Sequence, residues 1–241
     1  MMSVSTSDLV IGSLALTVNR KAIKNLHISV MPPEGKVRVS APENMTETAI
    51  RMAVIKRIPW IKKQKQSFIN QSRQSERQML SGESHYLWGQ RYRLEVIEQL
   101  GKHEILVKGN AKLRLNVSPN TSQENRTLVL SEFYRAQLKS RLPGLLEKWQ
   151  PILGVSLKDW RIQKMKTKWG SCSIDNQRIL LNLELAKKPL ECLEYILVHE
   201  LVHLLERKHS DRFVGHMDQH LPKWREYRNL LNCSPLASEV W

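Results

Sequence analysis

The stretch VHELVHLLERKHSDRF occupies residues 198–213 and contains three histidines within eleven positions. Apolar residues surround nearly every side of this segment, so the pattern predicts a core helix from Pro189 to about Arg207. Histidine and glutamate side chains are costly in a core unless something satisfies them. The stretch is therefore either an apolar helix with incidental histidines or a metal site.

The spacing of His199, Glu200 and His203 favours a metal site. Residues four apart lie on one face of a helix, so His199 and His203 can bind the same Zn²⁺. Glu200 lies beside these ligands, which suits a general base acting on metal-bound water. We therefore predict a catalytic zinc site and prefer it to a helix with incidental histidines.

His209, six residues after His203, is the candidate for the third ligand. If the helix simply continued, its side chain would point about 240° away and lie about 9 Å further along the axis. The chain must therefore turn after roughly Glu206. Ser210 followed by Asp211 is a good N-cap for another helix, so the local signals permit the turn.

Strand-forming residues dominate the first part of the chain, over 14–42 and 86–119. A helix is expected from Thr46 to about Asn70, and a polar connector over 71–84. The basic, mainly β platform is thus interrupted by one helix.

From about Gln123 the pattern becomes mainly helical. Pro143 and Gly144 predict a bend or break in the first long helix, and strands are expected over 159–165 and 179–185. We expect no internal repeat and divide the chain into two domains: a basic, mainly β region with one helix over 1–118, and a helical domain carrying the zinc site over 119–241.

The formal net charge is +15 at pH 7. Residues 1–118 hold 19 Lys and Arg against 9 Asp and Glu, and residues 119–241 hold 19 against 14. Such a field favours a polyanionic partner such as nucleic acid. Because the basic residues scatter singly, plain solubility explains them equally well.

Cysteine usage and hydropathy favour the cytoplasm. The three cysteines form no CxxC pair, as expected in a reducing compartment. No apolar run approaches the roughly 18–20 residues of a membrane span. The apolar stretch over 9–18 lacks a basic flank, so we expect neither a secretion signal nor a membrane partner. The sequence does not indicate an oligomeric state.

Four segments resemble the YgjP-like metallopeptidase domain, a family related to the SprT-like and Wss1-like zincins. They are KWGSCS at 168–173, ILLNLEL at 179–185, the helix and turn at 191–213, and LPKWREYRNLL at 221–231. The resemblance implies an α+β, zincin-like fold and the motif HExxHxxxxxH. It assigns one zinc per chain to His199, His203 and His209, and the role of base to Glu200. Metzincins share this spacing but place glycine at the position of Glu206, so the YgjP-like variant fits better.

The same resemblance implies that the strand at 179–185 is the sheet edge on which an extended peptide lies. Trp169, Leu181 and Asn182 are therefore candidate substrate-binding residues, with a turn-bonded Asn182 as the alternative. Ser171 and Cys172 adjoin a glycine, but no base lies near them in sequence, so we expect a structural role. His216 and His220 lack an intervening glutamate and are not expected to form a second metal site.

The sequence thus predicts a zinc-dependent hydrolase and favours a metallopeptidase acting on peptides or proteins. Two alternatives stay open. The same metal and base could attack phosphorus in a nucleotide or polyphosphate, as the charge of +15 suggests. A nucleic-acid-associated protein with mainly structural zinc is the other alternative.

Overall fold

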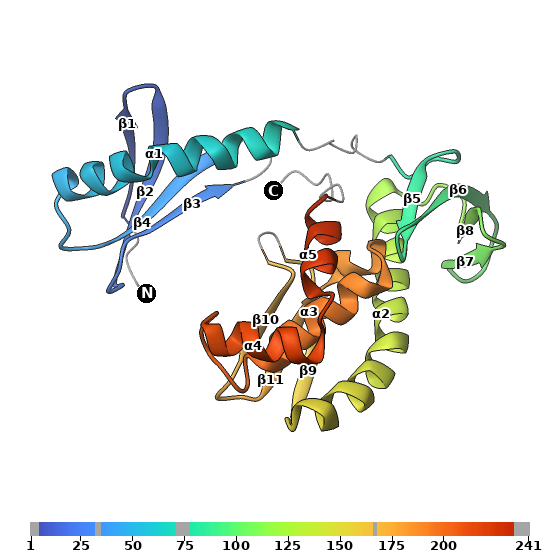
Figure 1. Ribbon diagram of the computed structural model, residues 1–241. Coiled ribbons are helices and arrows are strands. Elements are labelled where there is room, and N and C mark those ends of the chain that lie inside the picture. Colours follow the sequence, from blue (N-terminus) through green and yellow to red (C-terminus); the bar gives the residue numbers. More distant parts are fainter. Residues whose placement is uncertain (1–4, 32–34, 71–77, 166–167, 234–241) are drawn as a thin grey trace. The chain divides into compact units, whose positions relative to one another are not determined.

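The computed structural model describes residues 5–31, 35–70, 78–165 and 168–233 (Figure 1). The chain forms two compact units, the first from residues 1–75 with 235–241 and the second from 76–234. The division expected from the sequence, between residues 118 and 119, falls inside the second unit. Each unit is described by itself.

The first unit is a four-stranded sheet covered on one face by a long helix. Strands lie in the order β1-β2-β4-β3, with β2 and β4 parallel and the outer pairs antiparallel. In β4, Val37 and Val39 are buried while Lys36 and Arg38 are exposed, which is the alternation of a strand with one face on the core. Ile50 and Val54 of α1 complete the core. The bounds are β1 (Ser5–Ile11), β2 (Leu14–Lys21), β3 (His27–Met31), β4 (Lys36–Pro42) and α1 (Glu47–Asn70).

The second unit begins with a sheet of the same topology. Strands lie in the order β5-β6-β8-β7, again with the two inner strands parallel and the outer pairs antiparallel. The turn at Trp88-Gly89 separates the first two strands of this sheet, which form the hairpin β5–β6. The bounds are β5 (Ser84–Leu87), β6 (Gln90–Glu98), β7 (Glu104–Lys108), β8 (Lys112–Val117) and the following helix α2 (Gln123–Leu153).

These two ββββα segments are an internal repeat, so the expectation of no repeat is wrong. β2 and β6, β4 and β8, and α1 and α2 begin 76 residues apart, at Leu14 and Gln90, Lys36 and Lys112, and Glu47 and Gln123. The first hairpins turn at Gly12 and Trp88, also 76 apart, with φ of 59° and 51°. At the same offset His27, Lys36 and Arg38 match His103, Lys112 and Arg114. Few other residues are identical, which is why the sequence alone did not reveal the repeat.

Helix α2 is unbroken through Pro143 and Gly144 and curves along its length (Figure 1). The predicted bend is thus present without a break. Ser122 caps its N-terminus by accepting a hydrogen bond from the N–H of Asn125, and Gly154 ends it with φ of 65°. No helix in the described part of the chain is both long enough and apolar enough to span a bilayer.

A three-stranded sheet and four short helices complete the second unit. The strand order is β10-β11-β9, so β11 is the central strand and β10 lies at an edge. The predicted edge at 179–185 is therefore wrong, because β11 pairs on both sides. The α+β class with a mainly β first part is confirmed. The bounds are β9 (Asp159–Gln163), β10 (Gly170–Ser173), β11 (Arg178–Asn182), the 3-10 helix η1 (Leu183–Lys187), α3 (Leu190–Val202), α4 (Asp211–His220) and α5 (Trp224–Cys233).

Candidate metal centre and active site

Helix α3 is buried and positions the side chains of the site. It packs against β10, β11, α2, α4 and α5, and its apolar side chains after Leu190 are almost fully buried. His199 and His203 emerge from the same face, with ring centroids 4.9 Å apart. Glu200 is only 5% exposed. The helix that the sequence predicts is therefore present and presents all three side chains of the HExxH motif.

The chain turns immediately after this helix, without a glycine. Helix α3 ends at Val202 rather than near Arg207, and the N–H of Leu204 bonds to the carbonyl of Leu201 at 3.0 Å. Such shorter-range bonds tighten a last helical turn. None of the residues from His203 to Ser210 is among the described residues with positive φ. An early helix end thus removes the need for glycine at position 206.

Side-chain hydrogen bonds stabilise both ends of the turn. Nδ1 of His203 donates to the carbonyl oxygen of Glu206 at 3.1 Å; a carbonyl only accepts, so the lone pair of His203 is on Nε2. Oγ of Ser210 accepts from the N–H of Phe213, which confirms the predicted N-cap of α4. His209 lies in the chain between these two hydrogen bonds.

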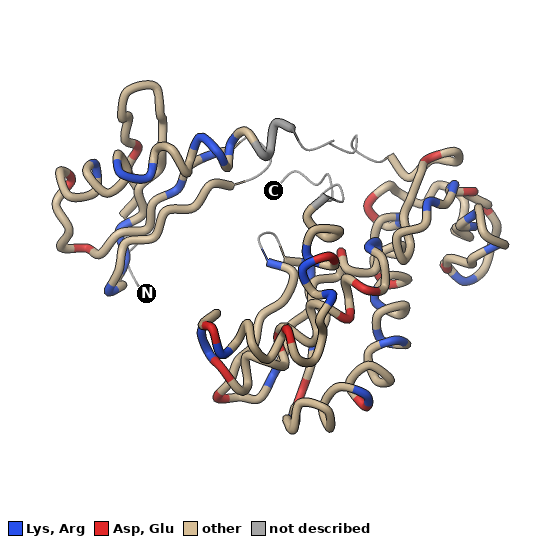
Figure 2. Tube along the Cα trace, viewed as in Figure 1, with Lys and Arg blue, Asp and Glu red and all other residues tan. Residues whose placement is uncertain are grey.

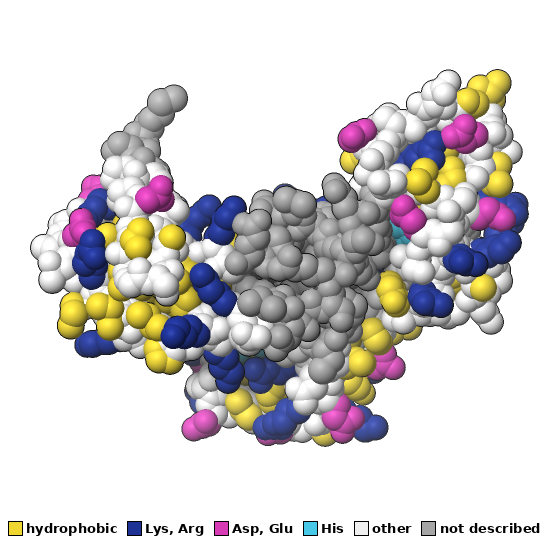
Figure 3. Space-filling model, turned by 90° about the horizontal axis from the view of Figure 1, so that it is seen from above, with side chains coloured by type: hydrophobic (Ala, Val, Ile, Leu, Met, Phe, Trp, Pro, Cys, Tyr) yellow, Lys and Arg dark blue, Asp and Glu magenta, His cyan; other side chains and the backbone are white. Residues whose placement is uncertain are grey.

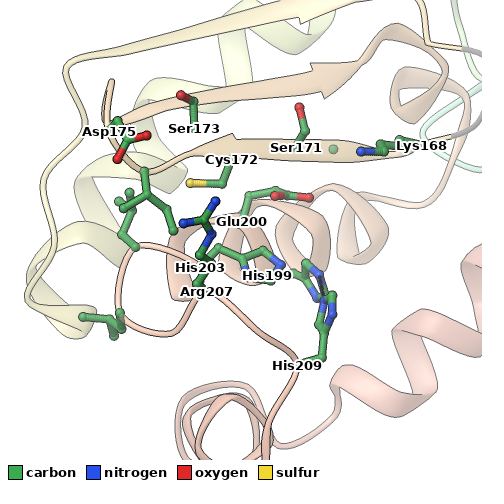
Figure 4. Close-up of a pocket in the computed structure, with 14 residues that line it drawn as sticks. Lys168, Ser171, Cys172, Ser173, Asp175, His199, Glu200, His203, Arg207 and His209 are labelled. Carbon is green, nitrogen blue, oxygen red and sulfur yellow. Dashed lines mark hydrogen bonds between the residues drawn. The ribbon is translucent and has the colours of Figure 1, made fainter. Parts of the chain in front are cut away.

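The turn brings His209 back to the two histidines of α3. Nε2 of His209 lies 3.0 Å from Nε2 of His199, and its ring centroid is 4.7 Å from that of His203. The potential ligand atoms of the three residues all lie within 4.8 Å of one another, and they are the one group of three or more such residues found among the described residues. Figure 4 shows the three rings facing one another.

The environment favours the neutral form of His199 and His203. Burial and, to a smaller extent, the neighbouring histidines lower the pKa of His199 to about 3. Burial also lowers the pKa of His203. Phe213 packs its ring against all three, with centroids 4.8 to 4.9 Å away. Neutral imidazole is the form that binds a metal, so this donor set fits a first-row transition metal ion.

Glu200 lies in the wall between α3 and β10. Burial raises the pKa of its carboxyl group to about 8, and the charge of Lys168 partly opposes this effect. A Cβ atom added to Gly170 would come within 2.6 Å of Oε1 of Glu200. β10 can therefore lie this close to the carboxylate only because glycine stands at position 170.

A pocket of about 820 Å³ opens over these groups (Figure 4). It is bounded by β10 and the turn that follows it on one side, and by α3 with its own following turn on the other. The lining residues are Lys168, Gly170, Ser171, Cys172, Ser173, Ile174, Asp175, His199, Glu200, His203, Leu204, Leu205, Arg207 and His209.

Trp169, Leu181 and Asn182 do not line the pocket, although the sequence analysis placed them at the substrate. Leu181 is fully buried and pairs in register with Gly170. The ring of Trp169 lies beneath the ammonium group of Lys188, 5.5 Å away. Because β11 pairs on both sides, its backbone is not free to pair with a peptide, and the side chains of Leu181 and Asn182 are buried.

Asn182 holds the segment that leads into β10. Nδ2 donates to the carbonyls of Met165 and Lys168, at 2.8 and 2.7 Å. Oδ1 accepts from the N–H groups of Met165 and Glu184, at 3.3 and 3.2 Å. The side chain is 4% exposed. This bonding is the turn-bonded alternative considered for Asn182.

Replacement of this asparagine should weaken the fold. Asn182→Ala removes four hydrogen bonds and leaves buried backbone groups unsatisfied, so the free energy of unfolding should fall by about 1–3 kcal/mol. Asn176→Ala is the matched control, because Asn176 is exposed and bonds only to Ser173. Urea denaturation of both variants measures the difference. Equal stability of the two variants would contradict this account of Asn182.

Lys168, Gly170 and Arg207 are pocket residues that the sequence analysis did not select. Lys168 and Gly170 flank Trp169 in the quoted KWGSCS segment, and this position in the sequence was the signal from which they could have been predicted. Arg207 was read only as part of a helix end, because its place in the pocket depends on the turn. Burial raises the pKa of the Cys172 thiol to about 11, which agrees with the expected absence of a nucleophilic role.

Comparison with known proteins agrees with this geometry. Residues 24–234 match the protein family described as “YgjP-like, metallopeptidase domain”. The chain belongs to this family. Its membership makes the protein a metallopeptidase hydrolase, and a catalytic metal is implied by the family and matched by the histidine triad. No curated protein matches the chain.

Two solved structures are similar to part of this YgjP-like chain. The metallopeptidase zymogen abylysin of Pyrococcus abyssi is 28% identical, with a TM-score of 0.35, over 37% of this chain and 90% of abylysin. The metallopeptidase zymogen jannalysin of Methanocaldococcus jannaschii is 22% identical, with a TM-score of 0.34, over 37% of this chain and 85% of jannalysin.

Proposed function

We propose that this protein is a zinc-dependent peptidase in which His199, His203 and His209 hold one Zn²⁺ and Glu200 is the general base. The observation that carries the proposal is the convergence of three imidazoles beside one buried carboxyl group in a single pocket. Two nitrogen ligands of one tetrahedral Zn²⁺ lie roughly 3.3 Å apart. The 3.0 Å between Nε2 of His199 and Nε2 of His209 is close to this span.

Bound Zn²⁺ would supply Lewis acidity, which polarises a substrate carbonyl and makes water more acidic. Glu200 accepts a proton from the attacking water as the oxygen of that water bonds to the carbonyl carbon. It then delivers this proton to the nitrogen of the leaving amine as the C–N bond breaks. The narrow gap beside Gly170 holds the carboxylate where both transfers can occur.

The edge strand β10 offers a place for the substrate backbone. It pairs with β11 on one side, and its other side faces the pocket that contains Glu200. An extended peptide can add to such an edge through main-chain hydrogen bonds, which tolerate different side chains. This role belongs to β10 instead of the strand at 179–185.

Gly170→Ala tests the closeness of β10 and Glu200. The added methyl group would meet Oε1 and Cγ of Glu200 at 2.6 and 2.8 Å, and Ile196 at 2.9 Å. Displacement of the base by about 1 Å should lower peptide hydrolysis by about 100-fold. Metal content, measured in the same samples, should not change, since the histidines keep their places.

Gly144→Ala is the matched control for this substitution. A Cβ atom at Gly144 meets no atom within 4 Å, and the residue lies in helix α2 away from the pocket. Its hydrolytic rate should equal that of the wild type. Full activity of the Gly170→Ala variant would show that the gap does not position the base.

A phosphohydrolase is the second candidate, and the cations of the pocket favour it. Lys168 and Arg207 line the cavity, and both side chains bind phosphate oxygens well. The zinc-loaded protein should be incubated with a denatured protein and, separately, with nucleoside triphosphates. Peptide products that disappear in Glu200→Gln support the peptidase. Glu200-dependent phosphate release without peptide products would overturn it.

A further inference from the structure

We infer that the first unit binds single-stranded nucleic acid on one exposed face of helix α1. We call this the basic face and define it by Lys56, Arg57, Trp60 and Lys63. The inference concerns a different part of the chain from the metal centre and does not depend on the proposed peptidase activity.

The charge of the protein is concentrated in this unit. Residues 1–75 hold twelve Lys and Arg against four Asp and Glu, a net of +8 of the total +15, in less than a third of the chain. No acidic residue occurs from Thr48 to Ser75. Figure 2 shows basic positions recurring along α1. The positive charge is thus denser here than in residues 76–241, which share a net charge of +7.

Lys56 and Lys63 of the basic face lie opposite the part of α1 that packs on the sheet, and Trp60 and Arg57 lie between them and that part around the helix. Ile50, Val54 and Ile61 are buried in the core of the unit. The four residues of the basic face follow one another at positions i, i+1, i+4 and i+7, so they share a side of the helix. All four are exposed, and in Figure 3 Lys and Arg side chains lie beside hydrophobic ones over this unit.

The cations of the basic face are available to a partner. No ion pair among the described residues involves Lys56, Arg57 or Lys63, whereas Arg51 in the first turns of the helix pairs with Glu47. Trp60 is 38% exposed and lies between these cations around the helix. A tryptophan among cations is the combination that stacks an unpaired base and binds the flanking phosphates.

At two positions of the internal repeat, a cation of α1 stands where α2 has a packing residue. In α2, Phe133 packs against the core and Leu138 is fully buried. The residues 76 positions earlier in α1 are Arg57 and Lys62, and both are exposed. The two copies of the repeat thus differ at positions where α2 packs against the rest of the second unit. Helix α1 presents positive charge at the corresponding places.

An anionic membrane is the less favoured partner for this surface. A helix that lies in a membrane interface inserts a continuous apolar face into the lipid. In α1 the apolar residues Ile50, Val54 and Ile61 are already buried against the sheet, and the large exposed apolar side chains in its described part are Met52, Ile55 and Trp60. Phosphates with unpaired bases match both the charges and the exposed indole, whereas lipid headgroups match only the charges.

The test uses the full-length protein and a labelled single-stranded oligonucleotide of about 20 nucleotides. Fluorescence anisotropy gives the affinity at several salt concentrations. The triple variant Lys56→Gln, Arg57→Gln, Lys63→Gln should reduce the slope of log K against log salt by about 2, which is about a 100-fold loss at 0.1 M salt. Trp60→Ala should weaken binding about 5- to 100-fold with an unchanged slope.

The matched control is the triple variant Lys108→Gln, Lys139→Gln, Arg141→Gln. It makes the same change of charge with the same residue types on exposed positions of the second unit, and Lys139 is the repeat counterpart of Lys63. The control should retain nearly all affinity. Equal losses in the two triple variants, or binding to phosphatidylserine vesicles but not to the oligonucleotide, would overturn the inference. Peptide hydrolysis and thermal melting should be the same in all variants.

Discussion

Glu200→Gln should abolish peptide hydrolysis while zinc remains bound. Glutamine has nearly the same shape, so it can occupy the narrow space beside Gly170, but its amide does not accept a proton from water at neutral pH. Loss of a general base typically lowers a rate by about 10²- to 10⁴-fold. Initial rates on a denatured protein substrate measure the loss, and elemental analysis of the same samples measures zinc per chain.

Glu191→Gln is the matched control for this substitution. Glu191 is exposed in the first turn of the same helix, so the chemical change is identical but lies away from the pocket. Only a few tenths of a kcal/mol of helix-dipole interaction should be lost, and the rate should match that of the wild type. Turnover retained by Glu200→Gln would remove this residue from the role of base.

The pairing of His199 with His203 was predictable because it is local. Positions four apart on a helix fix the relative direction of two side chains before any tertiary structure forms. The approach of His209 was less local, because it depends on where the helix ends. Ser210 gave the start of α4 correctly, but nothing in the sequence marked Val202 as the last residue of α3.

The position of a strand within its sheet was not predictable. The segment at 179–185 has the apolar residues of a strand that lies beside a buried helix. A central strand and an edge strand would both have these residues. Only the pairing of β11 with both β9 and β10 decides the matter. The candidates Leu181 and Asn182 were misplaced for the same reason, whereas Gly170 lies in β10 and lines the pocket.

The repeat was hidden because the two copies have different surroundings. The matching strands β2 and β6, β4 and β8, the first turns and the helix starts are all separated by 76 residues, since backbone topology does not depend on most side chains. The residues on the faces of their helices have diverged, because α2 must pack against the rest of the second unit whereas α1 packs against its own sheet. Apolar and basic residues at equivalent positions, such as Leu138 and Lys62, conceal the relationship in sequence.

His209→Ala should lower zinc affinity more than roughly 100-fold, the upper end of the loss seen when groups outside the ligand set are removed. The variant keeps His199 and His203 on α3, but two imidazoles leave half of a tetrahedral coordination sphere without protein ligands. His209 is exposed on the turn, so its removal should change the thermal stability of the metal-free protein little. Competition with a fluorescent zinc chelator measures the affinity.

His216→Ala separates a specific loss from a general effect of removing histidine. His216 lies on α4, where its ring stacks on that of His220 with centroids 6.2 Å apart, and neither residue belongs to the triad. This variant should bind one zinc with wild-type affinity. If it loses zinc, a second metal site exists on α4. If His209→Ala keeps wild-type affinity, the third ligand is a different residue, and the turn after α3 serves to shape the pocket instead of completing the metal centre.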